Sequence, residues 1–116
     1  NGPCDQADEI RFCSMANVKE PIWSSGGSTI AVCGLDHYSS NKIPAWKNCL
    51  LMLNLKDASL RALKLSDDGK NIISQRTWFK NRFGRLRDIC ISPEGNVYIC
   101  TGNGSNEDVL VEVSKL

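Results

Sequence analysis

The sequence predicts an all-β fold built from short strands. Turn-forming residues recur about every ten residues along the chain, and the segments between them are β-branched or alternate between apolar and polar residues. No segment has the sustained 3.6-residue period of a long amphipathic helix. These features are typical of β-sandwiches, barrels and propellers. A four-stranded propeller blade takes roughly 40–45 residues, so we expect about one blade in residues 29–79 and most of a second in residues 80–116. Residues 1–28 are expected to form an irregular lead-in to a single partial domain, residues 1–116.

The clearest local pattern is a β-hairpin centred on residues 92–96. Two β-branched runs, residues 89–91 and 97–99, flank the sequence Ser-Pro-Glu-Gly-Asn. Pro93 fixes its own φ angle for a turn, and Gly95 adopts a positive φ angle without steric penalty. Alternating apolar residues on both sides of such a turn predict an antiparallel pair of strands.

Two arginines, Arg85 and Arg87, stand just before this hairpin. Residues i and i+2 of a strand point to the same face of a sheet. We therefore expect both guanidinium groups on one face and Asp88 on the other. Two guanidiniums on one face form a candidate clamp for an anion, because each can bind a carboxylate through two charge-assisted hydrogen bonds.

The other predicted strands are bounded by similar turn signals. Residues 49–55 fit a helix or a strand by periodicity, but their short length favours a buried strand. The predicted strands are residues 29–35 with a continuation to 38, a hairpin of 49–55 with 60–65, residues 71–79 and residues 109–113. A loop of small residues occupies 24–28, and a Gly/Asn-rich loop occupies 102–106.

Composition excludes several classes of partner. The net charge is +1, which gives no electrostatic basis for binding nucleic acid or a charged membrane surface. No apolar run approaches the roughly 20 residues that a transmembrane helix needs. Since the chain begins at Asn1 without Met or an apolar signal segment, we expect a mature, cleaved or partial product.

Six cysteines in a chain of this length exceed cytosolic usage. They form no C-x-x-C pair and His37 is the only histidine, so no metal site is predicted. Disulfides in a secreted, periplasmic or extracellular protein are the preferred interpretation, and buried thiols are the alternative. Sequence does not select among the pairings, but Cys90 and Cys100 lie almost opposite each other across the hairpin and are favoured as one pair. Asn103 begins an Asn-Gly-Ser glycosylation sequon in a predicted loop.

A series of segments then occurs in a fixed order over residues 21–101. The segments are Pro21-Ile22-Trp23, Gly34-Leu35-Asp36-His37-Tyr38, Ile43-Pro44-Ala45-Trp46-Lys47-Asn48, Leu53-Asn54-Leu55-Lys56, Leu60-Arg61-Ala62-Leu63-Lys64-Leu65, Gly84-Arg85-Leu86-Arg87-Asp88-Ile89 and Ser92-Pro93-Glu94-Gly95-Asn96-Val97-Tyr98. This series resembles the C-terminal third of the soluble quinoprotein glucose/sorbosone dehydrogenases. The arginine pair followed by Asp88 and the hairpin is its most specific part.

The resemblance implies a six-bladed β-propeller, of which this chain holds about two blades. The family binds pyrroloquinoline quinone (PQQ) and calcium at the mouth of the central channel and oxidises aldoses to lactones. Lys56 corresponds to a family lysine that contacts the cofactor, Arg85 and Arg87 to its arginine pair, and Ser25 to a small hydroxyl residue that also faces the cofactor. The family's histidine base and calcium ligands lie in blades outside this chain. No catalytic residue or metal ligand is therefore assigned here, and His37 does not take the base role.

The chain also departs from the family pattern. Gly102 stands where the family often has Asp, and Ser24 stands where a turn proline is usual. Without the resemblance, Arg85 and Arg87 also suit structural pairing between blades, and Lys56 suits a solvated turn.

We therefore expect a fragment or subunit of a PQQ-dependent sugar dehydrogenase. The alternative is a non-catalytic extracellular propeller module that binds a protein or a glycan. A lactone-hydrolysing propeller is a third interpretation, but it requires a metal-binding carboxylate set that the sequence does not show. Two blades cannot close a ring and would leave strand edges exposed, so the remaining blades or a partner chain are expected to complete the structure.

Overall fold

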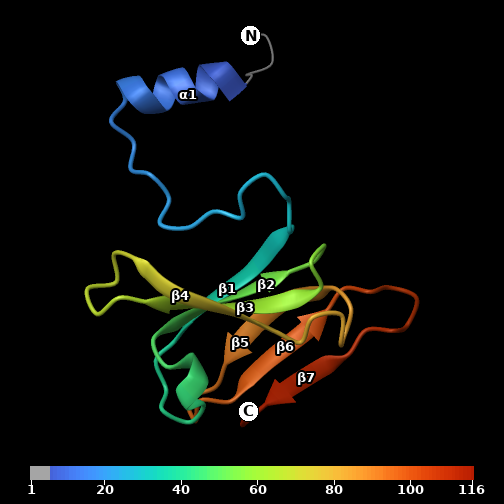
Figure 1. Cartoon of the computed structure of the whole chain (residues 1–116). Coiled ribbons are helices and arrows are strands. Elements are labelled where there is room, and N and C mark those ends of the chain that lie inside the picture. The colour runs from blue at the N-terminus through green and yellow to red at the C-terminus, as the bar shows by residue number, and fades with distance from the viewer. Residues whose placement is uncertain (1–5) are drawn as a thin grey trace.

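A computed structural model describes residues 6–116 of the chain (Figure 1). The elements follow in the order α1 (Gln6–Met15), β1 (Val32–Tyr38), a 3₁₀ helix η1 (Pro44–Trp46), β2 (Cys49–Asn54), β3 (Ser59–Leu65), β4 (Ile72–Trp78), β5 (Leu86–Ile91), β6 (Val97–Thr101) and β7 (Leu110–Val113). The strands form two antiparallel sheets, one of four strands in the order β1-β2-β3-β4 and one of three in the order β5-β6-β7. The prediction of an all-β fold is confirmed.

The predicted hairpin joins β5 to β6. Its turn is closed by hydrogen bonds between Ser92 and Asn96 and between Gly95 and Ser92, each 2.9 Å long. Gly95 has a φ angle of +85°, and a Cβ atom there would lie 2.2 Å from the Ser40 Oγ. The Tyr38 hydroxyl, at the end of β1, donates a 2.6 Å hydrogen bond to the Gly95 carbonyl. The turn is therefore fixed against the first sheet as well as closed within its own hairpin.

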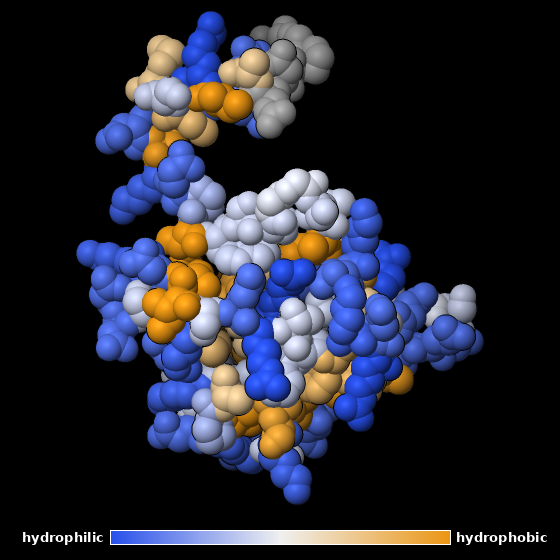
Figure 2. All heavy atoms as spheres, viewed as in Figure 1, coloured by the Kyte–Doolittle hydropathy of each residue, from blue (hydrophilic) through white to orange (hydrophobic). Residues whose placement is uncertain are grey.

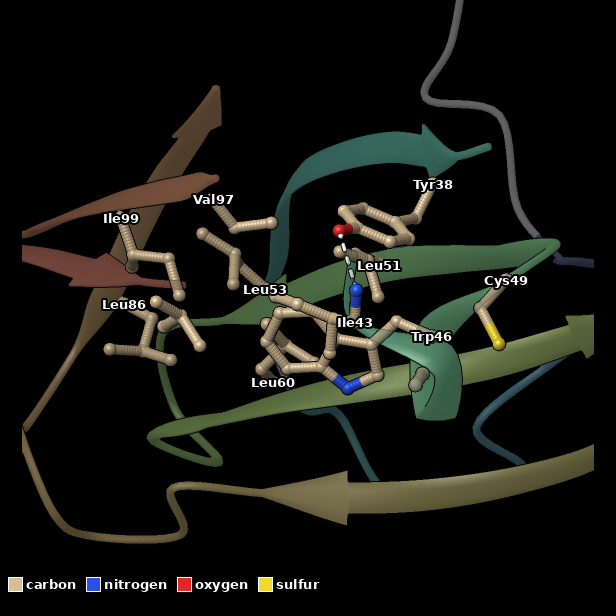
Figure 3. Packing of buried hydrophobic residues seen from close by; sticks show 12 residues of the cluster. Tyr38, Ile43, Trp46, Cys49, Leu51, Leu53, Leu60, Leu86, Val97 and Ile99 are labelled. Carbon is tan, nitrogen blue, oxygen red and sulfur yellow. Dashed lines mark hydrogen bonds between the residues drawn. The ribbon is translucent and has the colours of Figure 1, made fainter. Parts of the chain in front are cut away.

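A hydrophobic core lies between the two sheets (Figure 3). Trp46 is fully buried in this core, and its ring makes edge contacts with Tyr38 at 6.1 Å, Trp78 at 6.1 Å and Phe79 at 6.3 Å between centroids. The other buried members come from both sheets and the connection after β1: Ile43, Cys49, Leu51, Leu53, Leu60, Ala62, Leu86, Val97, Ile99 and Val113. Burial of apolar area on both sheets at once holds them together as one unit.

A smaller cluster covers the other face of the first sheet. Ile30, Met52 and Leu63 are its buried members, and Trp23 from the lead-in packs against them. The Trp23 indole also donates a 3.2 Å hydrogen bond to the Gln75 side chain on β4. The segment before β1 is thus attached to the sheet through the side chains of Trp23 and Ile30, and the Ile30 and Ala31 carbonyls also accept backbone hydrogen bonds from the β2–β3 connection.

Helix α1 is the element that the sequence analysis did not predict, since it expected an irregular lead-in. Ile10, Phe12 and Met15 of α1 are exposed, and Figure 2 shows apolar atoms on the helix, which lies apart from the sheets. Because these side chains do not line one packed face, they produce no clear helical period in the sequence. Within residues 6–116, no helix is long and apolar enough to cross a membrane.

The predicted Cys90–Cys100 disulfide is wrong. Cys13, Cys33, Cys49, Cys90 and Cys100 are all free thiols, and Cys4 lies outside the described residues. The register of the hairpin pairs Cys90 with Tyr98 and Cys100 with Asp88. The two cysteines are therefore diagonal neighbours rather than directly opposed. The alternative interpretation, buried thiols, fits Cys49, whose burial raises the pKa of its thiol.

Candidate functional site

The candidate site residues belong to loops and strand starts at one end of the two sheets. β1 and β5 start side by side at this end, as the 3.1 Å hydrogen bond from the Cys33 thiol to the Leu86 carbonyl shows. The next residue, Gly34, packs directly on Asp88, and a Cβ atom there would lie 3.2 Å from the Asp88 Cα. Antiparallel order brings the β2–β3, β4–β5 and β6–β7 connections to the same end. We call this the loop end; it comprises residues 24–31, 55–58, 79–85 and 102–109.

Arg85 and Arg87 flank the start of β5. Leu86 between them is fully buried in the core, whereas both arginines are exposed. The register runs from Leu86 opposite Thr101 to Asp88 opposite Cys100, so Arg87 is the extra residue of a β-bulge. The bulge interrupts the strict alternation that we predicted, and Asp88 is exposed as well.

Neither guanidinium makes a hydrogen bond or an ion pair with any residue in the range 6–116. The side chain of Arg87 instead lies across Gly102, and a Cβ atom on Gly102 would be 3.5 Å from the Arg87 Nε. The Gly102 N–H donates a 2.8 Å hydrogen bond to the Arg85 carbonyl. Arg85 and Arg87 are thus held by their backbone while their charged groups stay available.

Asn103 fixes the segment that precedes β5. Its side-chain Oδ1 accepts a 2.8 Å hydrogen bond from the Arg85 N–H, and its Nδ2 donates a 2.9 Å hydrogen bond to the Phe83 carbonyl. Gly84 makes this approach feasible, because a Cβ atom at this position, where φ is +77°, would lie 2.2 Å from the Asn103 Oδ1. A glycan on the predicted sequon would be attached to the Asn103 Nδ2, the same atom that donates to the Phe83 carbonyl. Sequence reasoning missed this role, since the two partners are 18 and 20 residues away.

Lys56 lies in the β2–β3 connection and is exposed. Its backbone N–H donates a 3.1 Å hydrogen bond to the Ile30 carbonyl, just before β1. Its ammonium group makes no hydrogen bond or ion pair among the described residues. Lys56 therefore resembles the two arginines in having an uncommitted positive charge at the loop end.

The neighbouring Asp57 has the opposite character, because it is saturated with internal partners. Its carboxylate accepts hydrogen bonds from Lys80, from the Ser59 hydroxyl at 2.6 Å and from Arg61 at 3.4 Å. The Lys80 ammonium, the strongest of these influences, lowers the pKa of Asp57 to about 2. Asp57 thereby forms ion pairs with Lys80 and Arg61, and the pair with Lys80 links the 55–58 loop to the 79–85 loop.

We expect Asp57 to make stability depend on pH in the acid range. Its pKa falls from 3.8 unfolded to about 2 folded, so its stabilisation is present above the unfolded value and is lost as pH falls toward about 2. Because Lys80 is half exposed, we expect only on the order of 1 kcal/mol. Urea unfolding should show that Asp57→Asn lowers the midpoint at pH 6 and that this difference shrinks by pH 2.5. Asp67→Asn, in the exposed β3–β4 turn, is the matched control, and an equal pH dependence in both variants would contradict the assignment.

The remaining predicted residues are placed differently. Ser25 is exposed at the loop end, and its side chain makes no hydrogen bond within the described part of the chain. His37 lies near the far end of β1, where its Nε2 is 3.1 Å from the Asn48 Oδ1. Across residues 6–116, no group of three or more His, Cys, Asp or Glu side chains could hold a metal ion.

Comparison with known proteins identifies the family. The sequence profile of the family "Glucose / Sorbosone dehydrogenase" matches residues 5–111. The chain belongs to this family. Membership confirms the resemblance that the segments from Pro21 to Tyr98 indicated.

Individual relatives agree with the family match. It is 30% identical over 100 residues to "Aldose sugar dehydrogenase YliI" of Escherichia coli (strain K12), covering 86% of this chain and 26% of that protein. It is also 30% identical over 91 residues to "Uncharacterized protein slr1608" of Synechocystis sp., covering 78% of this chain and 21% of that one. The chain therefore spans about a quarter of the length of the relatives it matches.

Solved structures show the same fold. A structure titled "glucose dehydrogenase" superposes with a TM-score of 0.71 at 23% identity, over 84% of this chain and 29% of that one. The apo form of the soluble aldose sugar dehydrogenase from Escherichia coli gives a TM-score of 0.61 at 24% identity, over 75% of this chain and 24% of that one. The two sheets of this family member thus correspond to part of a larger fold, in agreement with the predicted partial propeller.

Proposed function

We propose that this chain is part of a PQQ-dependent aldose dehydrogenase and supplies the cationic side of its cofactor site. The observation that carries the proposal is the pair of exposed guanidiniums, Arg85 and Arg87, which make no hydrogen bond or ion pair with residues 6–116. Lys56 adds a third uncommitted cation at the same end. Of the other cations at or next to this end, Lys80 and Arg61 are bound to Asp57, and the Arg82 guanidinium stacks 5.3 Å from the Phe83 ring.

The residues fit the chemistry of the cofactor. PQQ carries three carboxylates, and a guanidinium binds a carboxylate in a planar, bidentate geometry. Both guanidiniums are exposed, and the Arg87 side chain lies along Gly102 at ordinary van der Waals distance. A ligand that carries several carboxylates therefore suits a surface that presents these two cations.

The bound quinone would supply the two-electron acceptor for oxidation of the aldose to a lactone. In this proposal Arg85 and Arg87 hold carboxylates, and the Lys56 ammonium stabilises negative charge that develops near it. Ser25 contributes a hydroxyl from the 24–31 segment. The base that takes the sugar proton, and the ligands for calcium, come from parts of the protein outside this chain.

The remaining blades, or a partner chain, would cover the surfaces that the two sheets leave open. Ile73 on β4 is 63% exposed and Leu110 on β7 is 71% exposed. Both strands are sheet edges, which natural proteins cover or pair. We further propose an exported location, in keeping with the predicted function.

Replacing Lys56 tests the proposed function in the complete protein. We expect Lys56→Ala to lower kcat for dye-linked glucose oxidation, measured after adding PQQ and calcium, by about 100-fold, the usual effect of removing one group that stabilises transition-state charge. Lys70→Ala is the matched control, because Lys70 is an exposed lysine in the turn at the opposite end of the same sheet. Equal rates in the two variants would remove Lys56 from the site.

Complete absence of PQQ binding and glucose oxidation would favour the alternative, a non-catalytic propeller module. A complete wild-type protein that neither binds PQQ nor oxidises glucose would favour a propeller that binds a protein or a glycan. The sequence of the remaining blades would also distinguish the two functions, since the enzyme needs a histidine base there and the non-catalytic module does not.

A further inference from the structure

The β6–β7 loop contains an acid that the sequence analysis did not select. Asp108 is separated from the end of β6 by a turn in which Gly104, Ser105 and Asn106 all have φ angles between 55° and 75°. This turn reverses the chain, and the Glu107 N–H closes it with a 3.0 Å hydrogen bond to the Gly104 carbonyl. The loop thereby returns Asp108 to the residues that directly follow β6.

The carboxylate of Asp108 is fixed over those residues. Its Oδ1 accepts a 2.6 Å hydrogen bond from the Asn103 N–H and a 3.0 Å hydrogen bond from the Thr101 hydroxyl. Thr101 is buried, and its hydroxyl oxygen also accepts a 2.9 Å hydrogen bond from the Val109 N–H. Asp108 is therefore held by both neighbours of Gly102.

Arg87 lies across the same residue. The side chain of Arg87 contacts the open face of Gly102, with its Nε 3.5 Å and its Cδ 3.8 Å from the position of a Cβ atom. The Asp108 carboxylate and the Arg87 guanidinium thus approach Gly102 from two different elements, β5 and the β6–β7 loop. Consistent with this placement, hydrogen bonds from Asn103 and Thr101 lower the pKa of Asp108, and the charge of Arg87 contributes in the same direction.

We propose that Asp108 is a positioning residue that orients Arg87 for an anionic ligand from across Gly102. The inference rests on the proposed function for the identity of that ligand, a carboxylated quinone. Gly102 has no side chain of its own to orient the guanidinium. Asp108 and Arg87 form no hydrogen bond or ion pair in the described part of the chain, so Asp108 acts on the guanidinium through longer-range attraction. Two further titratable groups lie close by and have partners of their own: the Cys33 thiol is bound to backbone carbonyls, and the Asp88 carboxylate accepts a hydrogen bond from the Ile89 N–H.

Asp108→Asn separates charge from loop structure. Asparagine keeps the Oδ1 that accepts from Asn103 and Thr101, so the loop should stay closed while the negative charge is lost. A simple Coulomb effect would make PQQ bind more tightly to this variant, because an anion near an anionic ligand has been removed. A positioning role predicts the opposite sign: we expect the Kd for PQQ, measured on the complete protein, to rise about tenfold.

A second variant restores the negative charge beside Arg87 from position 102 instead of position 108. In Asp108→Asn combined with Gly102→Asp, a carboxylate stands directly beside the Arg87 Nε, and we expect the Kd to return to within about threefold of wild type. Glu107→Gln removes one negative charge from the same exposed loop and is the control that should leave the Kd unchanged. Unchanged or tighter binding in Asp108→Asn, or no recovery in the double variant, would overturn the proposal.

A readout without the cofactor keeps this test separate from the proposed function. With ¹⁵N-labelled arginine in the complete protein, the Nε–H signal of Arg87 should shift in Asp108→Asn and move back in the double variant. If wild-type protein binds no PQQ but this signal behaves as described, the proposed function fails and the positioning role stands. If the signal is the same in all three proteins, Asp108 does not orient Arg87.

Discussion

We expect Arg87→Ala to abolish tight PQQ binding by the complete protein. Arg87 is exposed, makes no hydrogen bond or ion pair within the described residues, and lies across Gly102 at the loop end. Loss of one partner of a desolvated, hydrogen-bonded charge pair costs roughly 2–5 kcal/mol, so we expect the Kd to rise by about 30-fold or more. Arg87→Lys should recover only part of the affinity, because an ammonium group lacks the planar fork of a guanidinium. Equilibrium titration of each variant with PQQ measures the change.

Arg76→Ala is the matched control for this variant. Arg76 is also exposed, but it lies on the outermost strand of the first sheet, where its guanidinium stacks 4.3 Å from the Trp78 ring. The same charge is lost from a guanidinium that already stacks on an aromatic ring outside the proposed site, so the Kd for PQQ should stay at the wild-type value. Wild-type affinity in Arg87→Ala would contradict the assignment of Arg87 to the cofactor site.

The largest effect on stability is expected from Trp46→Ala. Trp46 is fully buried between the sheets and contacts the rings of Tyr38, Trp78 and Phe79. Truncating a core tryptophan to alanine costs about 3–5 kcal/mol, because apolar contacts are lost and a cavity remains. We expect a large decrease in the urea unfolding midpoint, with a loss of cooperativity if the two sheets separate.

Trp23→Ala provides the comparison. Trp23 is half-buried and belongs to the smaller cluster on the outer face of the first sheet. Its truncation removes less buried area and one hydrogen bond to Gln75, so its effect on the midpoint should be clearly smaller. A Trp23→Ala effect as large as that of Trp46→Ala would mean that the lead-in, rather than the core between the sheets, holds this part of the chain together.

The strands could be predicted because their signals are local. The β5–β6 hairpin depends on Pro93 and Gly95, which determine the turn through their own φ angles. The hairpin of β2 with β3 follows from an apolar run and an alternating run separated by a short turn. Both patterns lie within about a dozen residues, so the sequence alone contains them.

The features that escaped prediction depend on pairing between distant segments. The bulge at Arg87 arises from a mismatch in residue count between β5 and β6, and no residue type near it marks that mismatch. The wrong Cys90–Cys100 disulfide has a different cause: the turn at residues 92–96 pairs Cys90 with Tyr98, which leaves Cys100 in a diagonal position. Asn103 was recognised only as a sequon, since its partners at Phe83 and Arg85 are brought to it by the fold.

The candidate site shows the same division. Its residue types could be carried over from the family resemblance, whereas the sequence could not show which cations are already bound. Lys56 and Lys80 are both exposed lysines on connections at the loop end, yet Asp57 binds Lys80 and leaves Lys56 uncommitted. That distinction requires the positions of the side chains.

Titration of the complete wild-type protein with PQQ and with its trimethyl ester tests the central claim most directly. The two ligands share the quinone, but the ester lacks the carboxylate charges that Arg85 and Arg87 are proposed to bind. We predict saturable binding of PQQ and at least about a 100-fold weaker affinity for the ester, because the charge-assisted hydrogen bonds are lost. Equal affinity for PQQ and its ester, or no binding of either ligand, would contradict the proposal that this end of the chain holds a carboxylated quinone.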